Sequence, residues 1–144
     1  MPWRFRGVAG AASVALATLA ILLTHAAQAD THRIQPGGLA AALDHLEPGD
    51  KLQLAAGTYR GSFVLDTPNT TLTGQGGAIL DAGDSGDVLR VAAPDTTVRG
   101  LVLRDSGQNL TDENAAVYLT KEAERARVLD NTLRHNLIGV NVKG

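Results

Sequence analysis

The sequence of 144 residues contains no cysteine, and its one methionine is the initiator. The chain therefore has no disulfide to hold its fold, and it offers no thiolate or internal thioether to a soft metal ion such as Cu(I). Aromatic residues make up only 3% of the chain, which leaves few ring faces on which sugars or bases could stack. The fold must depend on aliphatic packing and on backbone hydrogen bonds.

A strong charge of either sign is also absent. The chain has 13 lysines and arginines against 15 aspartates and glutamates, a net charge of −2. No basic run and no basic amphipathic helix occurs in the sequence. The composition therefore gives no indication of DNA or RNA binding, and none of attachment to an anionic membrane.

The first 29 residues have the features of a secretory signal peptide. Arg4 and Arg6 give a positive start, residues 8–23 are an apolar run, and Ala-Gln-Ala precedes Asp30 as a small-residue cleavage site. An N-terminal membrane anchor is the alternative, but the apolar run is shorter than the roughly 20 residues that a span needs. We predict cleavage after Ala29, export, and no membrane span in the mature protein.

A seven-residue motif occurs twice. Pro-Asn-Thr-Thr-Leu-Thr-Gly at residues 68–74 recurs as Pro-Asp-Thr-Thr-Val-Arg-Gly at 94–100, 26 residues later. A repeat at such a period is typical of a solenoid, in which each repeat forms one coil. Threonine is β-branched, proline opens the motif and glycine closes it, so each copy predicts a short strand. An antiparallel sandwich or barrel is the rival fold, but it does not explain a near-identical repeat at this distance.

The pattern predicts an all-β fold of stacked parallel coils. Leu72, Val98 and Val128 are expected at equivalent positions in successive coils. We expect Gly74, Gly100, Asn131 and Asn136 at sharp corners, where the left-handed backbone conformation is needed. A turn is predicted at residues 56–59. Strands are predicted at residues 51–54, 62–65, 68–74, 88–91, 94–104, 116–119, 127–129, 132–134 and 138–142.

One short helix is predicted before the coils. Leu39, Leu43 and Leu46 have helical spacing between turn clusters at 35–38 and 47–50. Such a helix would cover the open end of the first coil. The expected organisation is therefore a signal peptide at 1–29, an N-terminal segment with a capping helix at 30–50, and the first coils of a β-helix at 51–144. Because the pattern stops in mid-coil at residue 144, we expect a longer protein, of which this is the N-terminal part.

The predicted mature N-terminus is a candidate copper site. Cleavage after Ala29 would leave Asp30, Thr31 and His32 as the first three residues. A free amine, two backbone amides and an imidazole at the third position can form a square-planar nitrogen set that suits Cu(II) or Ni(II). His135, at a predicted corner, is a second candidate metal ligand.

No catalytic residue is predicted. Asp105, Asp112, Glu113 and Asp130 would lie near one another on the coils, as paired carboxylates do in polysaccharide-cleaving enzymes of this architecture. None of them lies within an apolar run that would raise its pKa for general acid catalysis. A polysaccharide lyase or epimerase stays as the alternative function, and a structural or adhesive solenoid as a third.

Several blocks, in their order and rough spacing, resemble the start of the NosD family, the periplasmic maturation proteins of nitrous oxide reductase. The blocks are residues 38–46, 48–50, 56–59, 71–77, 97–101, 106–107 and 130–131. The resemblance implies a right-handed, single-stranded parallel β-helix of the pectin-lyase-like kind in the periplasm. It also implies a non-enzymatic protein that helps to supply copper or sulfur to the reductase. The implied partners are an ABC transporter ATPase and permease, nitrous oxide reductase and a copper chaperone, and the implied cofactor is copper.

Overall fold

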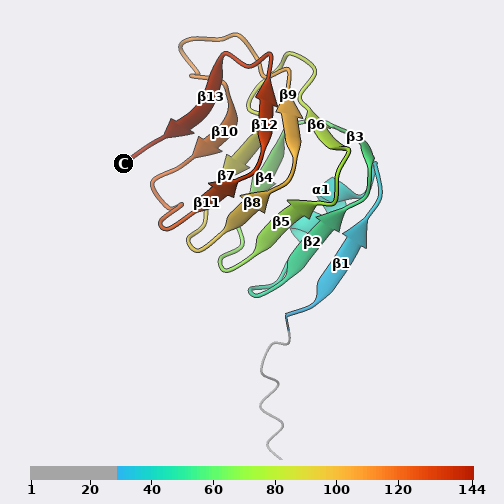
Figure 1. The fold of residues 1–144 in the computed structure, drawn as a ribbon. Coiled ribbons are helices and arrows are strands. Elements are labelled where there is room, and N and C mark those ends of the chain that lie inside the picture. The colour runs from blue at the N-terminus through green and yellow to red at the C-terminus, as the bar shows by residue number, and fades with distance from the viewer. Residues whose placement is uncertain (1–28) are drawn as a thin grey trace, which may run out of the picture.

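The computed structural model describes residues 29–144, which form 13 strands and one helix (Figure 1). The predicted signal peptide, residues 1–29, lies outside this part of the chain except for Ala29. Within residues 29–144, no helix has the length and hydrophobicity needed to cross a membrane.

The strands form three parallel sheets, which we name A, B and C. Sheet A contains β1 (Thr31–Ile34), β2 (Lys51–Leu54), β5 (Thr71–Gly74), β8 (Thr97–Arg99) and β11 (Arg127–Leu129). Sheet B contains β3 (Gly57–Arg60), β6 (Ala78–Asp81), β9 (Val102–Arg104) and β12 (Thr132–Arg134). Sheet C contains β4 (Phe63–Leu65), β7 (Leu89–Val91), β10 (Ala115–Leu119) and β13 (Ile138–Val142).

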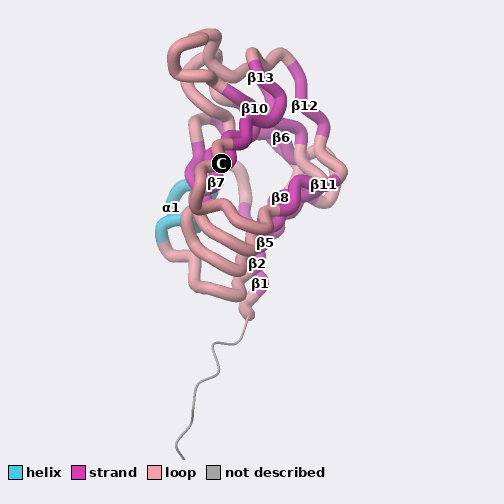
Figure 2. The backbone as a smooth tube through the Cα atoms, turned by 90° about the vertical axis from the view of Figure 1, so that its left-hand side faces the viewer, coloured by secondary structure: helices cyan, strands magenta, loops and turns pink. Residues whose placement is uncertain are grey.

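Each full coil takes one strand from each sheet in turn, and Figure 2 shows the backbone winding around a common interior. Leu72 pairs with Leu52 in the coil before and with Val98 in the coil after, and Val98 pairs with Val128. Because all these pairs are parallel, the predicted architecture and its register are confirmed. Stacked aliphatic side chains fill the interior: Leu52, Leu72 and Val98 from sheet A are each at most 1% exposed.

The helix α1 (Leu39–Asp44) caps the first coil, as predicted. It buries Leu39 and Leu43 and packs against β4, at the edge of sheet C where a preceding coil would place a strand. The apolar end of the coil is therefore shielded from water.

Several local predictions differ from the structure, and Ala78–Asp81, which the sequence also left without an element, is strand β6. Thr31–Ile34, which the sequence left without an element, is strand β1 and starts sheet A. The predicted turn at 56–59 is wrong, because Gly57–Arg60 is strand β3. Packing overrides the turn signal of Gly57 here. Tyr59 is only 1% exposed, and its hydroxyl donates to the carbonyl oxygens of Ile34 and Ala55, each 2.8 Å away.

The corners are sharp but only partly as predicted. Gly100 has a positive φ of 69°, whereas the left-handed residues near the two asparagines are Asp130 and His135, with φ of 53° and 52°. Asn131 instead bridges coils, donating through Nδ2 to the Val98 carbonyl at 2.9 Å. The prediction of left-handed asparagines is therefore wrong by one residue at each corner.

Gly74 is required for a different reason from the one predicted. A Cβ at this position would lie 2.5 Å from the carbonyl oxygen of Gly100 in the next coil. Close approach of two backbones, not a left-handed conformation, therefore selects glycine at the end of β5.

Candidate metal centre

The pairing of β1 with β2 brings three potential ligands together at the start of the first two strands. Asp30 and His32 belong to the first strand segment, and Asp50 immediately precedes β2. One ligand atom from each residue lies within 4.8 Å of the others. We name these three residues the candidate metal centre.

Asp50 is the buried member, with only 5% of its surface exposed. Its Oδ1 accepts a hydrogen bond from the amide of Asp30 at 3.1 Å, and its Oδ2 accepts one from the amide of Glu47 at 3.0 Å. The Nε2 atom of His32 lies 3.3 Å from the same Oδ2. The carboxylate therefore ties β1 to the turn that follows the capping helix.

The environment keeps Asp50 ionised. Burial by itself would raise the pKa of this carboxyl, but the hydrogen bonds from the amides of Glu47 and Asp30 and the proximity of His32 together outweigh burial and lower the pKa below its usual value. A buried, charged carboxylate beside an imidazole is a suitable ligand for a cation, because no proton has to leave it at neutral pH.

The donor set fits some metal ions and not others. One imidazole nitrogen and two carboxylate oxygens suit divalent ions such as Cu(II) or Zn(II), whereas Cu(I) prefers sulfur, which these residues lack. The side chain of His32 is 47% exposed and Asp30 is also exposed, so an ion could enter from solvent. Such a site would leave coordination positions open for water or for a partner.

The predicted ligands are only partly brought together. Thr31 pairs with Lys51, and its side chain points to the opposite face of the strand from His32. In an extended strand, successive amides also point in opposite directions, so those of Thr31 and His32 do not converge on one ion. The square-planar chelate and strand β1 are therefore alternative arrangements of the same backbone.

Asp50 was missed in the sequence, where it was assigned only to the turn after the helix. Asp50 could have been identified as a ligand if Thr31–Ile34 had been recognised as a strand. Once β1 is aligned with β2, Asp30 and Asp50 each precede their strand by one residue. Parallel pairing then places the two carboxylates side by side.

His135 does not join this centre. It lies at the corner after β12 in the last coil, whereas His32 lies in β1, the first strand. The His135 side chain is 81% exposed, and its Nδ1 atom lies 3.5 Å from Oδ1 of Asp105. Among residues 29–144, no group of three histidines or carboxylates that could hold an ion includes it.

The carboxylates considered for a lyase are each held in a separate contact. Asp105 lies 3.3 Å from Nε of Arg104, and Asp130 lies 3.1 Å from Nε of Arg99. Glu113 contacts Lys143, and Asp112 accepts a hydrogen bond from Asn109 at 2.6 Å. These four carboxylates therefore form contacts within corners and loops, and none of the contacts joins two of them as a catalytic pair.

The chain is similar to two curated proteins, although no family model matches it. It is 44% identical over 87 residues to a probable ABC transporter binding protein NosD of Pseudomonas aeruginosa, which covers 60% of the chain and 20% of that protein. It is 33% identical over 135 residues to a protein of the same description from Stutzerimonas stutzeri, covering 90% of the chain and 28% of that protein. The chain thus spans less than a third of the length of either relative.

The architecture is also found in a solved structure. A pectin methylesterase crystallised with a hexasaccharide superposes with a TM-score of 0.54 at 17% identity, over 74% of this chain and 45% of that one. This likeness concerns the fold alone. In sequence and fold together, the chain is a NosD-like, pectin-lyase-like parallel β-helix.

Proposed function

We propose that the chain belongs to a periplasmic accessory protein that works with an ABC transporter in the maturation of nitrous oxide reductase. The observation that carries this proposal is the 33% identity over 90% of the chain to a relative described as an ABC transporter binding protein NosD. In this role the protein is non-enzymatic, and its partners are the transporter ATPase and permease, the reductase and a copper chaperone.

The candidate metal centre supports a role in handling copper. Its imidazole and two carboxylates are donors that Cu(II) accepts. Copper would here be cargo in transit, since the accessible His32 leaves room for a partner to supply further ligands. Delivery of copper or of sulfur to the reductase is the step that the accessory protein would assist.

Deletion of the gene in the bacterium of origin tests this function. We expect the reductase to accumulate with less copper per subunit, measured by elemental analysis of the purified enzyme, and to regain copper when the full-length gene is restored. A reductase with its full copper content in the deletion strain would contradict the proposal. Turnover of a uronate polymer by the full-length protein would instead favour a lyase or epimerase.

A further inference from the structure

The backbone nitrogen of Asp30 lies against the buried carboxylate of Asp50. Its N–H group donates a hydrogen bond to Oδ1 at 3.1 Å. Cleavage after Ala29, the predicted end of the signal peptide, would convert this same nitrogen from a neutral amide into the terminal amine of the mature chain. The position of one atom therefore connects the processing of the chain with the interior of the fold.

Both partners of this contact are held in place by the neighbouring backbone. The carbonyl oxygen of Asp30 accepts a hydrogen bond from the amide of Lys51 at 2.8 Å. The backbone of Asp50 is held on both sides, because its amide donates to the Glu47 carbonyl at 3.0 Å and its carbonyl accepts from the Thr71 amide at 3.1 Å. The position of the nitrogen beside the carboxylate is therefore set by the strands and not by its charge.

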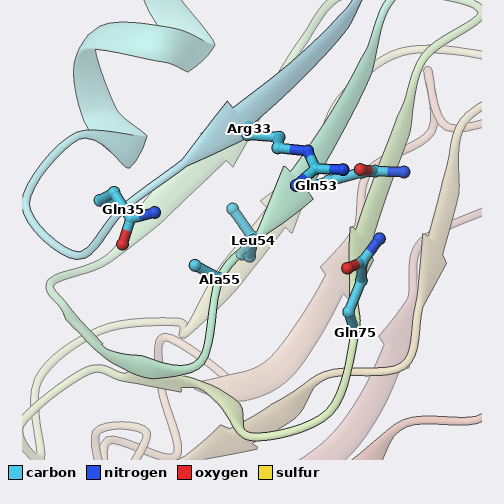
Figure 3. A pocket seen from close by; sticks show the side chains of 6 residues that line it. All are labelled: Arg33, Gln35, Gln53, Leu54, Ala55 and Gln75. Atoms are coloured by element: carbon cyan, nitrogen blue, oxygen red, sulfur yellow. The ribbon is translucent and has the colours of Figure 1, made fainter.

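The alignment of β1 with β2 determines where a chain that starts at Asp30 begins. Thr31 pairs with Lys51, so the residues immediately before them lie side by side. The same alignment continues along the strands, where the paired residues Arg33 and Gln53 extend their side chains to the same side of the sheet (Figure 3). A terminal amine on Asp30 is therefore placed directly before a strand that pairs along its whole length.

Asp50 lacks a permanently charged partner. Its carboxylate is buried and ionised, because burial would raise its pKa but the hydrogen bonds from backbone amides outweigh burial. Among residues 29–144, no lysine or arginine forms an ion pair with it. Its one ion-pair contact is with Nε2 of His32 at 3.3 Å, and that imidazole is charged only when it is protonated. Since buried charges in proteins are normally paired, a cation is expected beside this carboxylate.

We propose that removal of the signal peptide creates an ion pair between the terminal ammonium of Asp30 and the carboxylate of Asp50, and that this pair holds β1 against the first full coil. In the cleavage step, water adds its hydroxyl to the carbonyl carbon of Ala29 and the C–N bond breaks. The Asp30 nitrogen leaves as an amine, which is protonated at neutral pH. The reaction requires only water and a peptidase, and the ion pair requires neither a metal ion nor a transporter.

The new charge strengthens a contact that already exists. A positive charge on a nitrogen 3.1 Å from a carboxylate is attracted strongly where water is partly excluded. Asp50 is desolvated before and after cleavage, so the ion pair adds no burial penalty at that carboxylate, and the exposed position of Asp30 leaves its ammonium in contact with water. The ion pair is therefore stabilising overall, unlike a pair in which both charges must be buried.

Two forms of the full chain without its signal peptide test the proposal. A cleavable fusion partner releases the chain with either Asp30 or Ala29 as its first residue, and a chelator in all buffers keeps metal ions out of the candidate metal centre. The Ala29 form keeps the amide hydrogen bond but moves the charge by one residue, about 3.8 Å along the chain. Urea unfolding should give an unfolding equilibrium constant about fivefold larger for the Ala29 form, because its contact with Asp50 lacks the charge on the donor.

Substitution of the acceptor tests whether the difference depends on Asp50. In the Asp50→Asn background the two forms should be equally stable. The matched control Asp44→Asn removes an exposed carboxylate from α1 and should keep the difference between the two forms.

Hydrogen exchange gives a local measurement that needs no substitution. The amide of Lys51, which donates to the Asp30 carbonyl, should exchange more slowly in the Asp30 form than in the Ala29 form. The amide of Lys143 donates to the Leu119 carbonyl in the last coil and should exchange equally in both forms.

Several results would overturn the proposal. Equal stability of the two unsubstituted forms, or equal exchange of their Lys51 amides, would show that the terminal charge adds nothing to the contact. A difference that persists in Asp50→Asn would assign the ammonium to another acceptor, and a difference that is lost in Asp30→Asn would assign it to the carboxylate of Asp30 itself. N-terminal sequencing of the exported protein that finds a first residue other than Asp30 would show that this ion pair does not form in the cell.

Discussion

The buried carboxylate of Asp50 accepts a hydrogen bond from the backbone amide of Asp30, 3.1 Å away, across the first two strands of sheet A. This contact ties β1 to the first full coil, which begins with β2. The same carboxylate also caps the turn at Glu47 and approaches His32, so one side chain links the capping helix, strand β1 and the candidate metal centre.

Replacement of Asp50 by asparagine should destabilise the fold. The amide nitrogen of the new side chain would face a backbone donor, and a hydrogen bond to a charged acceptor contributes about 1.5–3 kcal/mol. We expect the free energy of unfolding, measured in urea, to fall by about 2 kcal/mol. Asp44→Asn, on the exposed side of α1, is the control and should change stability little. Equal effects of the two substitutions would contradict the role given to Asp50.

Acid should lower the free energy of unfolding by protonating two buried carboxylates, Asp50 and Asp81. Burial would raise the pKa of Asp81, but hydrogen bonds from the amide of Gly83 and the guanidinium of Arg104 outweigh burial and lower that pKa. The pKa of Asp50 is lowered in the same way by its own hydrogen-bond donors. In the unfolded chain both carboxyls have a pKa of about 3.9. Their contribution to stability is therefore complete above that pH and is lost as the pH falls below it towards the folded pKa.

Urea unfolding between pH 5 and pH 2, a range of about three units around the reference value, measures this dependence. The free energy of unfolding should decline with acidity in the native protein and decline less in the Asp81→Asn variant. A decline of the same steepness in the variant would show that Asp81 does not titrate as the structure indicates.

Binding of Cu(II) should depend on His32 and not on His135. Because His32 lies within the candidate metal centre and His135 lies in the last coil, His32→Ala should abolish tight binding while His135→Ala retains it. Titration of the mature protein followed by visible absorption or electron paramagnetic resonance measures the loss. Equal binding of Cu(II) by the His32→Ala variant would show that the candidate metal centre is not the copper site.

Two further variants distinguish the two possible copper sites. The square-planar nitrogen set requires a free amine on Asp30 and does not use Asp50, whereas the side-chain centre uses Asp50 and tolerates an extra residue before Asp30. Binding that survives N-terminal extension and is lost in Asp50→Asn supports the side-chain centre. The reverse pattern supports the chelate, and N-terminal sequencing of the secreted protein establishes whether Asp30 is the first residue.

Asn131 should contribute to the stacking of the last two coils. Its Oδ1 accepts from the amide of Leu101 at 3.0 Å, and its Nδ2 donates to the carbonyl of Val98 at 2.9 Å. Asn131→Ala leaves both backbone groups without these partners, and an unsatisfied buried polar group costs about 1–3 kcal/mol. Thermal unfolding should show a lower midpoint than for Gln108→Ala, whose side chain bonds only to a carbonyl two residues away.

The repeat was sufficient to predict the coils, because copies of one motif must occupy equivalent positions in a solenoid. It did not reveal β1, since Thr31–Ile34 has no second copy of the motif and becomes a strand only by pairing with β2. The outer side of sheet A was equally hidden in the sequence. Its cations are scattered from Arg33 to Arg127 in the sequence and meet only through the register of five strands. Composition alone therefore correctly showed no basic run, yet missed a basic surface.

The parallel register of β5 and β8, the two strands of the repeated motif, underlies the β-helix, and engineered cysteines test it directly because the native chain has none. Parallel pairing aligns Thr71 with Thr97 and Thr73 with Arg99. The pairs Thr71→Cys/Thr97→Cys and Thr73→Cys/Arg99→Cys should therefore form disulfides under mild oxidation, since partner Cα atoms about 5 Å apart can be bridged. The crossed pairs Thr71→Cys/Arg99→Cys and Thr73→Cys/Thr97→Cys should remain reduced. Mass spectrometry that finds disulfides in the crossed pairs and none in the aligned pairs would show antiparallel strands and contradict the β-helix.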